Sequence, residues 1–293
     1  MKNFKLRQGK NPIYPIEKGI FETVTNKKKP YFSENEKYFA VCPQCDNPIQ
    51  IIGLYKHIKV SPYGKHYGND ISIARYNSQA YQYCPYRQKK MSLNKNRKKR
   101  KLTGFEKNIY DTVRENYDTA VYILSKAIHI RISQKLAERM LISYIKHETW
   151  LYPWATLNNV PWMIGYFFSA ESLYKKLIKT DSPLYHAILK KCPAVYFEPG
   201  YMEGYSILLT KEWIELYFSL YEHKKEVSGD VCRETLEFRV TEKKNGQYIL
   251  IYKELLIVDE TYYMNLLHKE NTYRNERLIE MAIKEMPEIL TQK

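Results

Sequence analysis

The pair of cysteines in Cys42-Pro43-Gln44-Cys45 constrains the fold of this chain more than any other feature. It stands between two short apolar runs, 38–41 and 49–54, whose composition is typical of β-strands. A tight turn between two strands brings both thiolates toward one metal ion, and zinc takes four nitrogen or sulfur ligands at tetrahedral angles. The motif predicts half of a zinc site.

The other two ligands are expected farther along the same segment. Cys84 is the third. For the fourth we favour His66, because it lies in the glycine-flanked segment 63–68 about midway between the cysteine turn and Cys84, and His57 is the reserve. The result is a closed Cys3His site for a structural Zn2+, with the ligands Cys42, Cys45, His66 and Cys84.

A second Cys-x-x-Cys pair is missing, which leaves one alternative open. The three cysteines could be thiols that bind no metal. A redox-active pair is less favoured because no βαβ pattern surrounds the motif. Cys192 and Cys232 lie far away in the sequence and are expected in the core rather than at a metal.

Residues 1–88 are poor in helical periodicity and rich in Pro and Gly turn signals. We predict a small β-rich, zinc-ribbon-like module over this range. Such a loop-rich segment buries little apolar surface, so the metal would supply much of its folding free energy. Zinc-finger peptides gain on the order of 10 to 16 kcal/mol from the metal.

The positive charge of the chain is confined to its first third. The net charge is +15, and residues 1–104 hold 22 Lys and Arg against 6 Asp and Glu, which leaves the remainder close to neutral. We interpret 89–104 as a basic linker, which is solvated or neutralised by a partner. The residues expected to contact nucleic acid or an acidic protein are Lys89, Lys90, Arg97, Lys98, Lys99, Arg100 and Lys101.

After the basic linker the pattern becomes mainly helical, over residues 105–293. Apolar residues at spacings of three and four predict a long helix over 105–147, either continuous or broken near 130–133. Further helices are expected over 183–191, 211–225 and 260–286. Alternation around Asn245-Gly246 predicts a β-hairpin near 234–258. The fold class is α+β.

A search for catalytic motifs returns nothing that fits. His147 and Glu148 begin an H-E-x-x-H pattern, but Leu151 occupies the position of the second histidine. No phosphate-binding glycine loop or nucleophile elbow is present. Asp230, Glu234 and Glu237 could surround a Mg2+ ion as in nucleases, although exposed faces carry such acids routinely. We expect a protein that is not an enzyme.

Tyrosine is abundant, with 28 Tyr against 10 Phe and 4 Trp. Tyrosine is enriched at protein interfaces, where one side of the ring is apolar and the hydroxyl is wet. Tyr201 and Tyr205, in the glycine-rich segment 198–205, are the candidate partner contacts. The alternative is that Tyr replaces Phe in a chain with an AT-rich coding bias.

No run reaches the roughly 18 to 20 apolar residues of a membrane-spanning helix. The basic start of the chain lacks the apolar segment of a secretory signal. An odd number of cysteines, five, favours reduced thiols. We therefore expect a cytoplasmic protein with no membrane partner.

The Cys/His segment resembles a known group of proteins. The residues that carry the likeness are 41–56, 62–67 and 81–86, and over them the chain is similar to phage-encoded inhibitors of the bacterial Gabija defence system. The resemblance covers about 45 residues, and the rest of the chain adds no motif. Beyond the four metal ligands, it transfers no functional residue.

The resemblance implies an anti-defence protein that works by binding in the host cytoplasm. It would form a homo-oligomer around the Gabija nuclease and ATPase complex and block access to DNA or its cleavage. The alternative function is a zinc-stabilised nucleic-acid-binding protein that uses the basic segment 87–101 on phosphates.

Overall fold

The computed structural model describes residues 1–33, 35–55, 61–87, 95–96, 98–269 and 274–290. Helices and antiparallel sheets alternate along the chain, which places it in the α+β class. The helices are α1 (Lys18–Thr25), α2 (Ser78–Gln82), α3 (Gly104–Ala127), α4 (Gln134–Lys146), α5 (Val160–Tyr166), α6 (Pro183–Lys191), α7 (Tyr262–Leu266) and α8 (Glu276–Glu285), with 3-10 turns at Thr149–Leu151 and Leu157–Asn159.

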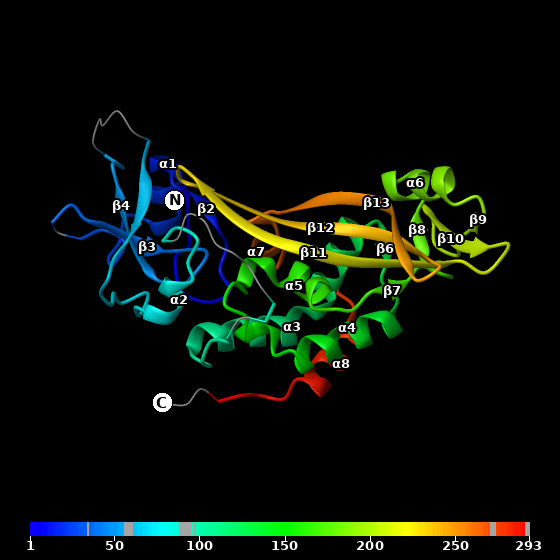
Figure 1. Ribbon diagram of the computed structural model, residues 1–293. Helices are drawn as coiled ribbons and strands as arrows, with labels where there is room; N and C mark the ends of the chain where they lie inside the picture. The colour runs from blue at the N-terminus through cyan, green and yellow to red at the C-terminus, as the bar shows by residue number, and fades with distance from the viewer. Residues whose placement is uncertain (34, 56–60, 88–94, 97, 270–273, 291–293) are drawn as a thin grey trace.

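Two small sheets form the N-terminal side of the molecule (Figure 1). One pairs β1 (Asn3–Phe4) with β2 (Tyr14–Pro15), and the other has the order β3 (Tyr38–Val41), β4 (Pro48–Ile52) and β5 (Tyr63–His66). Both sheets are antiparallel. Lys5 and Val41 bridge them through two backbone hydrogen bonds of 2.9 Å. These strands make up most of the regular structure in residues 1–88.

Two four-stranded antiparallel sheets make up the rest of the described strands. The first has the order β6 (Ile130–Arg131), β8 (Leu177–Lys179), β10 (Tyr205–Thr210), β9 (Val195–Pro199). The second has the order β13 (Gln247–Val258), β12 (Val231–Lys244), β11 (Glu215–Ser228), β7 (Glu171–Ser172). Figure 1 shows β11, β12 and β13 running from the N-terminal strands to the end of the molecule that holds β8, β9 and β10.

The mainly helical character expected for 105–293 is therefore wrong, since two sheets are interleaved with the helices. The helix expected over 211–225 is replaced by β11. Leu216, Phe218 and Leu220 are buried at every second position, which is the period of a strand. β12 and β13 meet at Asn245 and Gly246, whose φ angles are +51° and +76°.

The long helical segment is broken where the sequence allowed a break. α3 ends at Ala127, His129 has a φ of +58°, and the two residues of β6 separate α3 from α4. The expected start of α6 is also confirmed, because the Ser182 hydroxyl accepts a hydrogen bond from the Tyr185 amide, 3.2 Å away. Between residues 260 and 286 the described helices are two short ones, α7 and α8, and not one long helix.

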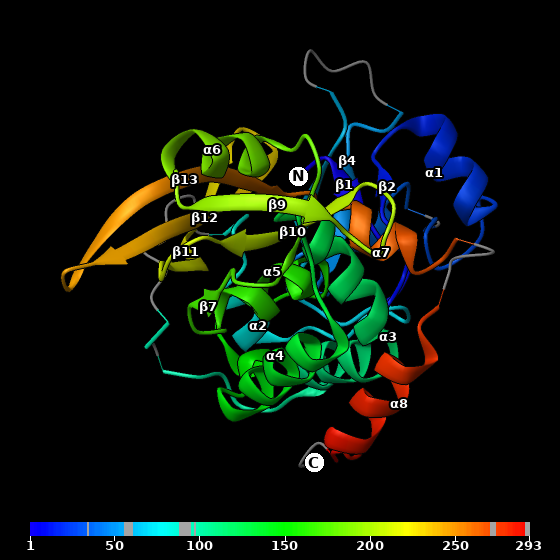
Figure 2. The same ribbon diagram turned by 90° about the vertical axis from the view of Figure 1, so that its right-hand side faces the viewer.

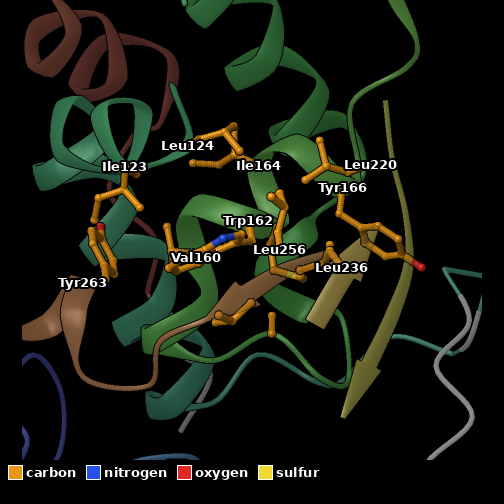
Figure 3. Close-up of a cluster of buried hydrophobic side chains, with 14 of the residues drawn as sticks. Ile123, Leu124, Val160, Trp162, Ile164, Tyr166, Leu220, Leu236, Leu256 and Tyr263 are labelled. Carbon is orange, nitrogen blue, oxygen red and sulfur yellow. The ribbon is translucent and has the colours of Figure 1, made fainter. Parts of the chain in front are cut away.

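One apolar core joins the helices to the long sheet (Figure 3). α3, α4 and α5 lie on one side of the long strands, and Figure 2 shows α6 beside β9 and β13. The core draws on α3, α5, α7 and three strands through Ile123, Leu124, Val160, Trp162, Ile164, Leu220, Leu236, Leu256 and Tyr263. All of these side chains are buried, so the helical layer and the sheet form one packed unit.

Arg100 corrects the interpretation of 89–104 as a solvated linker. Its side chain is buried, and its guanidinium Nε lies 3.1 Å from Oε1 of the fully buried Glu106. This is a charge contact and not an aligned hydrogen bond. The Arg100 Nη2 also donates to the Ala155 carbonyl at 2.9 Å. Glu106 in turn accepts from the Thr103 amide at 3.0 Å and so caps α3.

We predict that Arg100→Ala destabilises the protein strongly, because it leaves the Glu106 carboxylate buried without its counter-charge. The expected loss of unfolding free energy is about 3 to 5 kcal/mol. Urea denaturation followed by circular dichroism measures it.

Lys98→Ala is the control, since Lys98 is exposed and its loss should change stability by less than about 0.5 kcal/mol. Equal stability of the two variants would show that the buried ion pair does not hold this segment to α3.

Candidate metal centre

The four residues proposed as metal ligands meet at one point in the fold. The ligand atoms of Cys42, Cys45, His66 and Cys84 all lie within 4.8 Å of one another. The Cys42 and Cys84 sulfurs are 3.9 Å apart, and the His66 Nε2 lies 3.3 Å from the Cys45 sulfur and 3.6 Å from the Cys84 sulfur. Among the described residues this is the group of side chains that could hold a metal ion.

The three shortest of these separations are compatible with a tetrahedral metal site. Zinc bonds are about 2.3 Å to sulfur and about 2.0 to 2.1 Å to nitrogen, so a tetrahedron places two sulfurs about 3.8 Å apart and sulfur and nitrogen about 3.6 Å apart. The measured distances fall within a few tenths of an ångström of both values. Three thiols and one imidazole are also the donor set that zinc prefers over Mg2+ or Ca2+.

The cysteine turn is built by backbone hydrogen bonds between β3 and β4. The Cys42 amide donates to the Asn47 carbonyl at 2.8 Å, and the Asp46 amide donates to the Cys42 carbonyl at 3.1 Å. Asp46 has a φ of +57°, which reverses the chain before β4 begins at Pro48. His66 ends β5 and pairs with Ile49 in β4, so the sheet register sets its position beside the turn.

Asn47 connects the turn to α2, which precedes Cys84. Its side-chain amide lies 3.3 Å from the Cys45 sulfur and donates to the Asn77 carbonyl at 3.1 Å. The Asn77 amide donates back to the Asn47 Oδ1 at 2.7 Å. The Asn77 side chain accepts a hydrogen bond from the Ala80 amide and so caps α2. Through its two hydrogen bonds with Asn77, Asn47 therefore links the cysteine turn to the helix that precedes Cys84.

The three thiols are nearly inaccessible to solvent, and their ionisation is coupled. Burial opposes ionisation of Cys45, but hydrogen bonds from Cys42, Cys84 and Asn47 outweigh burial and lower the pKa of the Cys45 thiol. Burial, together with the two neighbouring sulfurs, raises the pKa of Cys84 well above its usual value. Three adjacent thiolates need a cation among them, which is what a divalent metal would supply.

The residues between the two cysteines attach this turn to the rest of the molecule. The Pro43 carbonyl accepts a hydrogen bond from the Asn158 side chain at 3.0 Å. The Gln44 side chain donates to Glu260 at 2.8 Å, and burial raises the pKa of Glu260. Asn47 could have been suspected from its place directly after the motif, but nothing in the sequence indicated Asn158 or Glu260.

The basic-segment candidates divide into three groups. Lys98, Lys99 and Lys101 are exposed, and the Lys99 ammonium lies 2.7 Å from the Glu148 carboxylate. Arg100 is buried and therefore not available to a phosphate. The remaining candidates, Lys89, Lys90 and Arg97, lie outside the described residues, as does the reserve ligand His57.

The candidate partner contacts lie far from the metal ligands, at the end of the molecule formed by β8, β9 and β10 (Figure 1). Tyr201 is 84% exposed, whereas Tyr205 is half-buried at the start of β10. The sequence search missed Trp213, which is 90% exposed in the loop after β10. The signal in the sequence was Trp213 itself, because tryptophan is highly buried on average and is informative when it is exposed.

The three acids considered for a nuclease site do not converge. Asp230 pairs with the Met1 amine at 3.0 Å, and Glu237 pairs with Arg239 and Lys253. Glu234 is buried elsewhere, in the sheet. Each carboxylate is thus neutralised by its own cation, and in the described part of the chain they do not form a shared metal site.

Glu234 belongs to a buried polar cluster beside a β-bulge in β11. Its carboxylate contacts the Lys225 ammonium at 3.1 Å, the His223 Nε2 at 2.6 Å and the Asn159 side-chain amide at 2.6 Å. Against its burial, Lys225 and His223 lower the pKa of Glu234 to about 2. Burial lowers the pKa of His223, so the cluster at neutral pH is one Lys–Glu ion pair with a neutral histidine.

No family model, no curated protein and no solved structure matches this chain. Within the described residues, none of the helices combines the length and apolarity needed to cross a membrane.

We predict that the purified protein contains about one zinc ion per chain, as a closed tetrahedral site requires. Elemental analysis should show that Cys45→Ser with Cys84→Ser loses the metal, because each change removes a thiolate donor. Without its metal the N-terminal module should become susceptible to proteolysis, since binding and folding are linked.

Cys192→Ser is the matched control. Cys192 is also buried, and burial raises the pKa of its thiol to about 11, but it lies after α6 and away from the cluster. A wild-type protein without metal, or equal metal content in all three proteins, would refute the site.

We predict that Glu234 makes stability depend on acid pH. Its folded pKa, about 2, lies below the ordinary value of 4.5, so its contribution is present above pH 4.5 and is lost as pH falls toward 2. The difference corresponds to on the order of 3 kcal/mol. Urea unfolding between pH 5 and pH 2.5 should show a steeper decline for wild type than for Glu234→Gln, and parallel curves would contradict this role.

Proposed function

We propose that this chain is a non-catalytic binding protein in which a structural zinc ion holds a zinc-ribbon-like N-terminal module. The observation that supports this most is the closed cluster of Cys42, Cys45, His66 and Cys84. The three sulfurs are at most 1% exposed, and four protein donors leave no coordination position for a substrate. The pairing of Asp230, Glu234 and Glu237 with separate cations agrees with a role that does not use catalysis.

The surface we propose for a protein partner is the end of the molecule around β10. Tyr201 precedes this strand and Trp213 follows it, and both rings are almost fully exposed. Exposed Trp and Tyr side chains are the commonest interface hot spots, because each buries a large rigid area at small entropic cost. Trp213 is 90% exposed, so a partner that covers its ring would remove a large apolar surface from water. Burial of that surface favours binding.

The resemblance of the Cys/His segment to Gabija inhibitors is what supports the choice of that partner. We propose that the chain binds the Gabija nuclease and ATPase complex in the host cytoplasm. It would assemble there as a homo-oligomer and keep DNA from the nuclease. Such inhibition would depend on the contact area between the two proteins and would not require a catalysed reaction.

A nucleic-acid-binding function is the second candidate, and a specific observation favours it. Lys98 and Lys101 are exposed and take part in no ion pair among the described residues, next to a module with a large positive charge. Such lysines can release counterions from phosphates. Arg100 is no longer part of this proposal.

We predict that the protein and a Gabija complex co-elute in size-exclusion chromatography with light scattering, at physiological and at high salt. Tyr201→Ala with Trp213→Ala should weaken the complex at least tenfold, the loss expected for hot-spot aromatics. Tyr122→Ala, at a 42% exposed tyrosine on α3, is the control and should bind like wild type.

Salt dependence distinguishes the two functions. Binding to duplex DNA would weaken with a log-log slope of about −0.9 for each phosphate neutralised, whereas an aromatic protein interface is less sensitive. Separate elution at both salt concentrations would discard the Gabija complex as partner. DNA binding that disappears at high salt would then favour the second function.

A further inference from the structure

A hollow of about 300 Å3 lies between the basic segment and the C-terminal end of α4. Lys95 and Lys99 line it from one side, and Lys146 and His147 from the other. Tyr152 and Phe167 form its aromatic wall. We call these residues the basic pocket. The pocket lies between two segments about fifty residues apart in the chain. The sequence of either segment alone does not indicate a pocket.

Lys95 enters this pocket without a carboxylate partner among the described residues. Its ammonium lies 4.1 Å above the centre of the Tyr166 ring and 5.8 Å from that of Phe167. Lys95 is exposed to solvent, and its partial burial against the rings lowers the pKa of its ammonium. The aromatic faces attract the cation but do not neutralise it, so the ammonium is available to an anion.

The charges around the pocket do not cancel. Glu148 directly follows His147 in the chain, and its carboxylate is paired with Lys99 at 2.7 Å. Lys146 lies in the last turn of α4, where a cation offsets the carbonyl end of the helix. His147 donates through Nδ1 to the Ser143 carbonyl at 2.8 Å, so its Nε2 can donate to an anion only when the imidazole is protonated. Of the three ammonium groups, Lys99 is therefore the one that has a carboxylate partner in the described part of the chain.

We propose that the basic pocket binds a phosphate group. A phosphate offers several oxygens within a small radius, and it can accept charge-assisted hydrogen bonds from Lys95, Lys99 and Lys146 together. The aromatic wall keeps water from one side of the ligand, which strengthens these interactions. The pocket takes the phosphate of a free nucleotide or of a single-stranded nucleic acid, because both present the same group.

The test measures binding of three probes to the full-length protein: pyrophosphate, ATP and a fluorescein-labelled ten-nucleotide oligo(dT). Lys95→Ala with Lys146→Ala should weaken binding roughly tenfold or more, as loss of charge-assisted hydrogen bonds does. Lys135→Ala with Lys190→Ala is the control. It removes the same charge from two exposed lysines away from the pocket and should bind within about twofold of wild type.

The outcomes separate the two ligand sources. Binding of ATP and pyrophosphate without oligo(dT) assigns the pocket to a free nucleotide, and binding of oligo(dT) that pyrophosphate displaces assigns it to nucleic acid. No binding of any probe to wild type, or equal weakening in both double variants, overturns the proposal. Thermal unfolding checks that both variants are folded.

This proposal is independent of the partner. The variant Lys95→Ala with Lys146→Ala leaves Tyr201 and Trp213 intact, so it should still co-elute with a Gabija complex. Failure of phosphate binding and failure of complex formation are therefore separate results.

Discussion

The convergence of three thiols and one imidazole within 4.8 Å is the constraint on which the N-terminal part of this structure depends. Cys42 and Cys45 come from the turn between β3 and β4, His66 from the end of β5 and Cys84 from the residues after α2. These segments also contribute buried apolar residues to the core, among them Ile49, Ile51 and Ala80. A cation among the four donors would add to this packing, because metal binding is itself folding free energy.

Buried ion pairs fix the chain beside the cysteine turn and at the start of α3. Lys5 and Asp46 form an ion pair that is almost inaccessible to solvent, directly beside the cysteine turn. Arg100 and Glu106 form another at the start of α3. Removing one member of such a pair costs more than the pair contributes, so these contacts define a unique arrangement more than they add stability. The basic segment is thus partly a structural element and partly a charged surface.

Local patterns predicted a large part of the structure. The three cysteines of the cluster followed from their spacing and His66 from its place in a glycine-flanked segment. The break between α3 and α4 followed from helical periodicity, and the start of α6 from Ser182. The error at β11 has a physical cause, since apolar residues in 215–221 fit both a helical and an alternating pattern. β11 is a strand because it pairs with β12 along nearly its whole length. This pairing is a tertiary interaction, which the local sequence pattern does not contain. Arg100 was misassigned because a run of basic residues does not show which member meets a buried acid.

The attachment of the cysteine turn has a consequence for the evolution of such chains. The two middle residues of the turn supply no ligand to the Cys/His cluster. Here Gln44 is hydrogen-bonded to Glu260, and the carbonyl beside it to Asn158, so these positions are coupled across more than one hundred residues. A substitution at 44 that removes the amide takes away the shortest hydrogen bond to the Glu260 carboxylate and leaves it with Asn3 and Tyr86 as donors. Related chains should therefore vary positions 44 and 260 together. The residue between the two cysteines is constrained by its hydrogen bond to the chain just after β13.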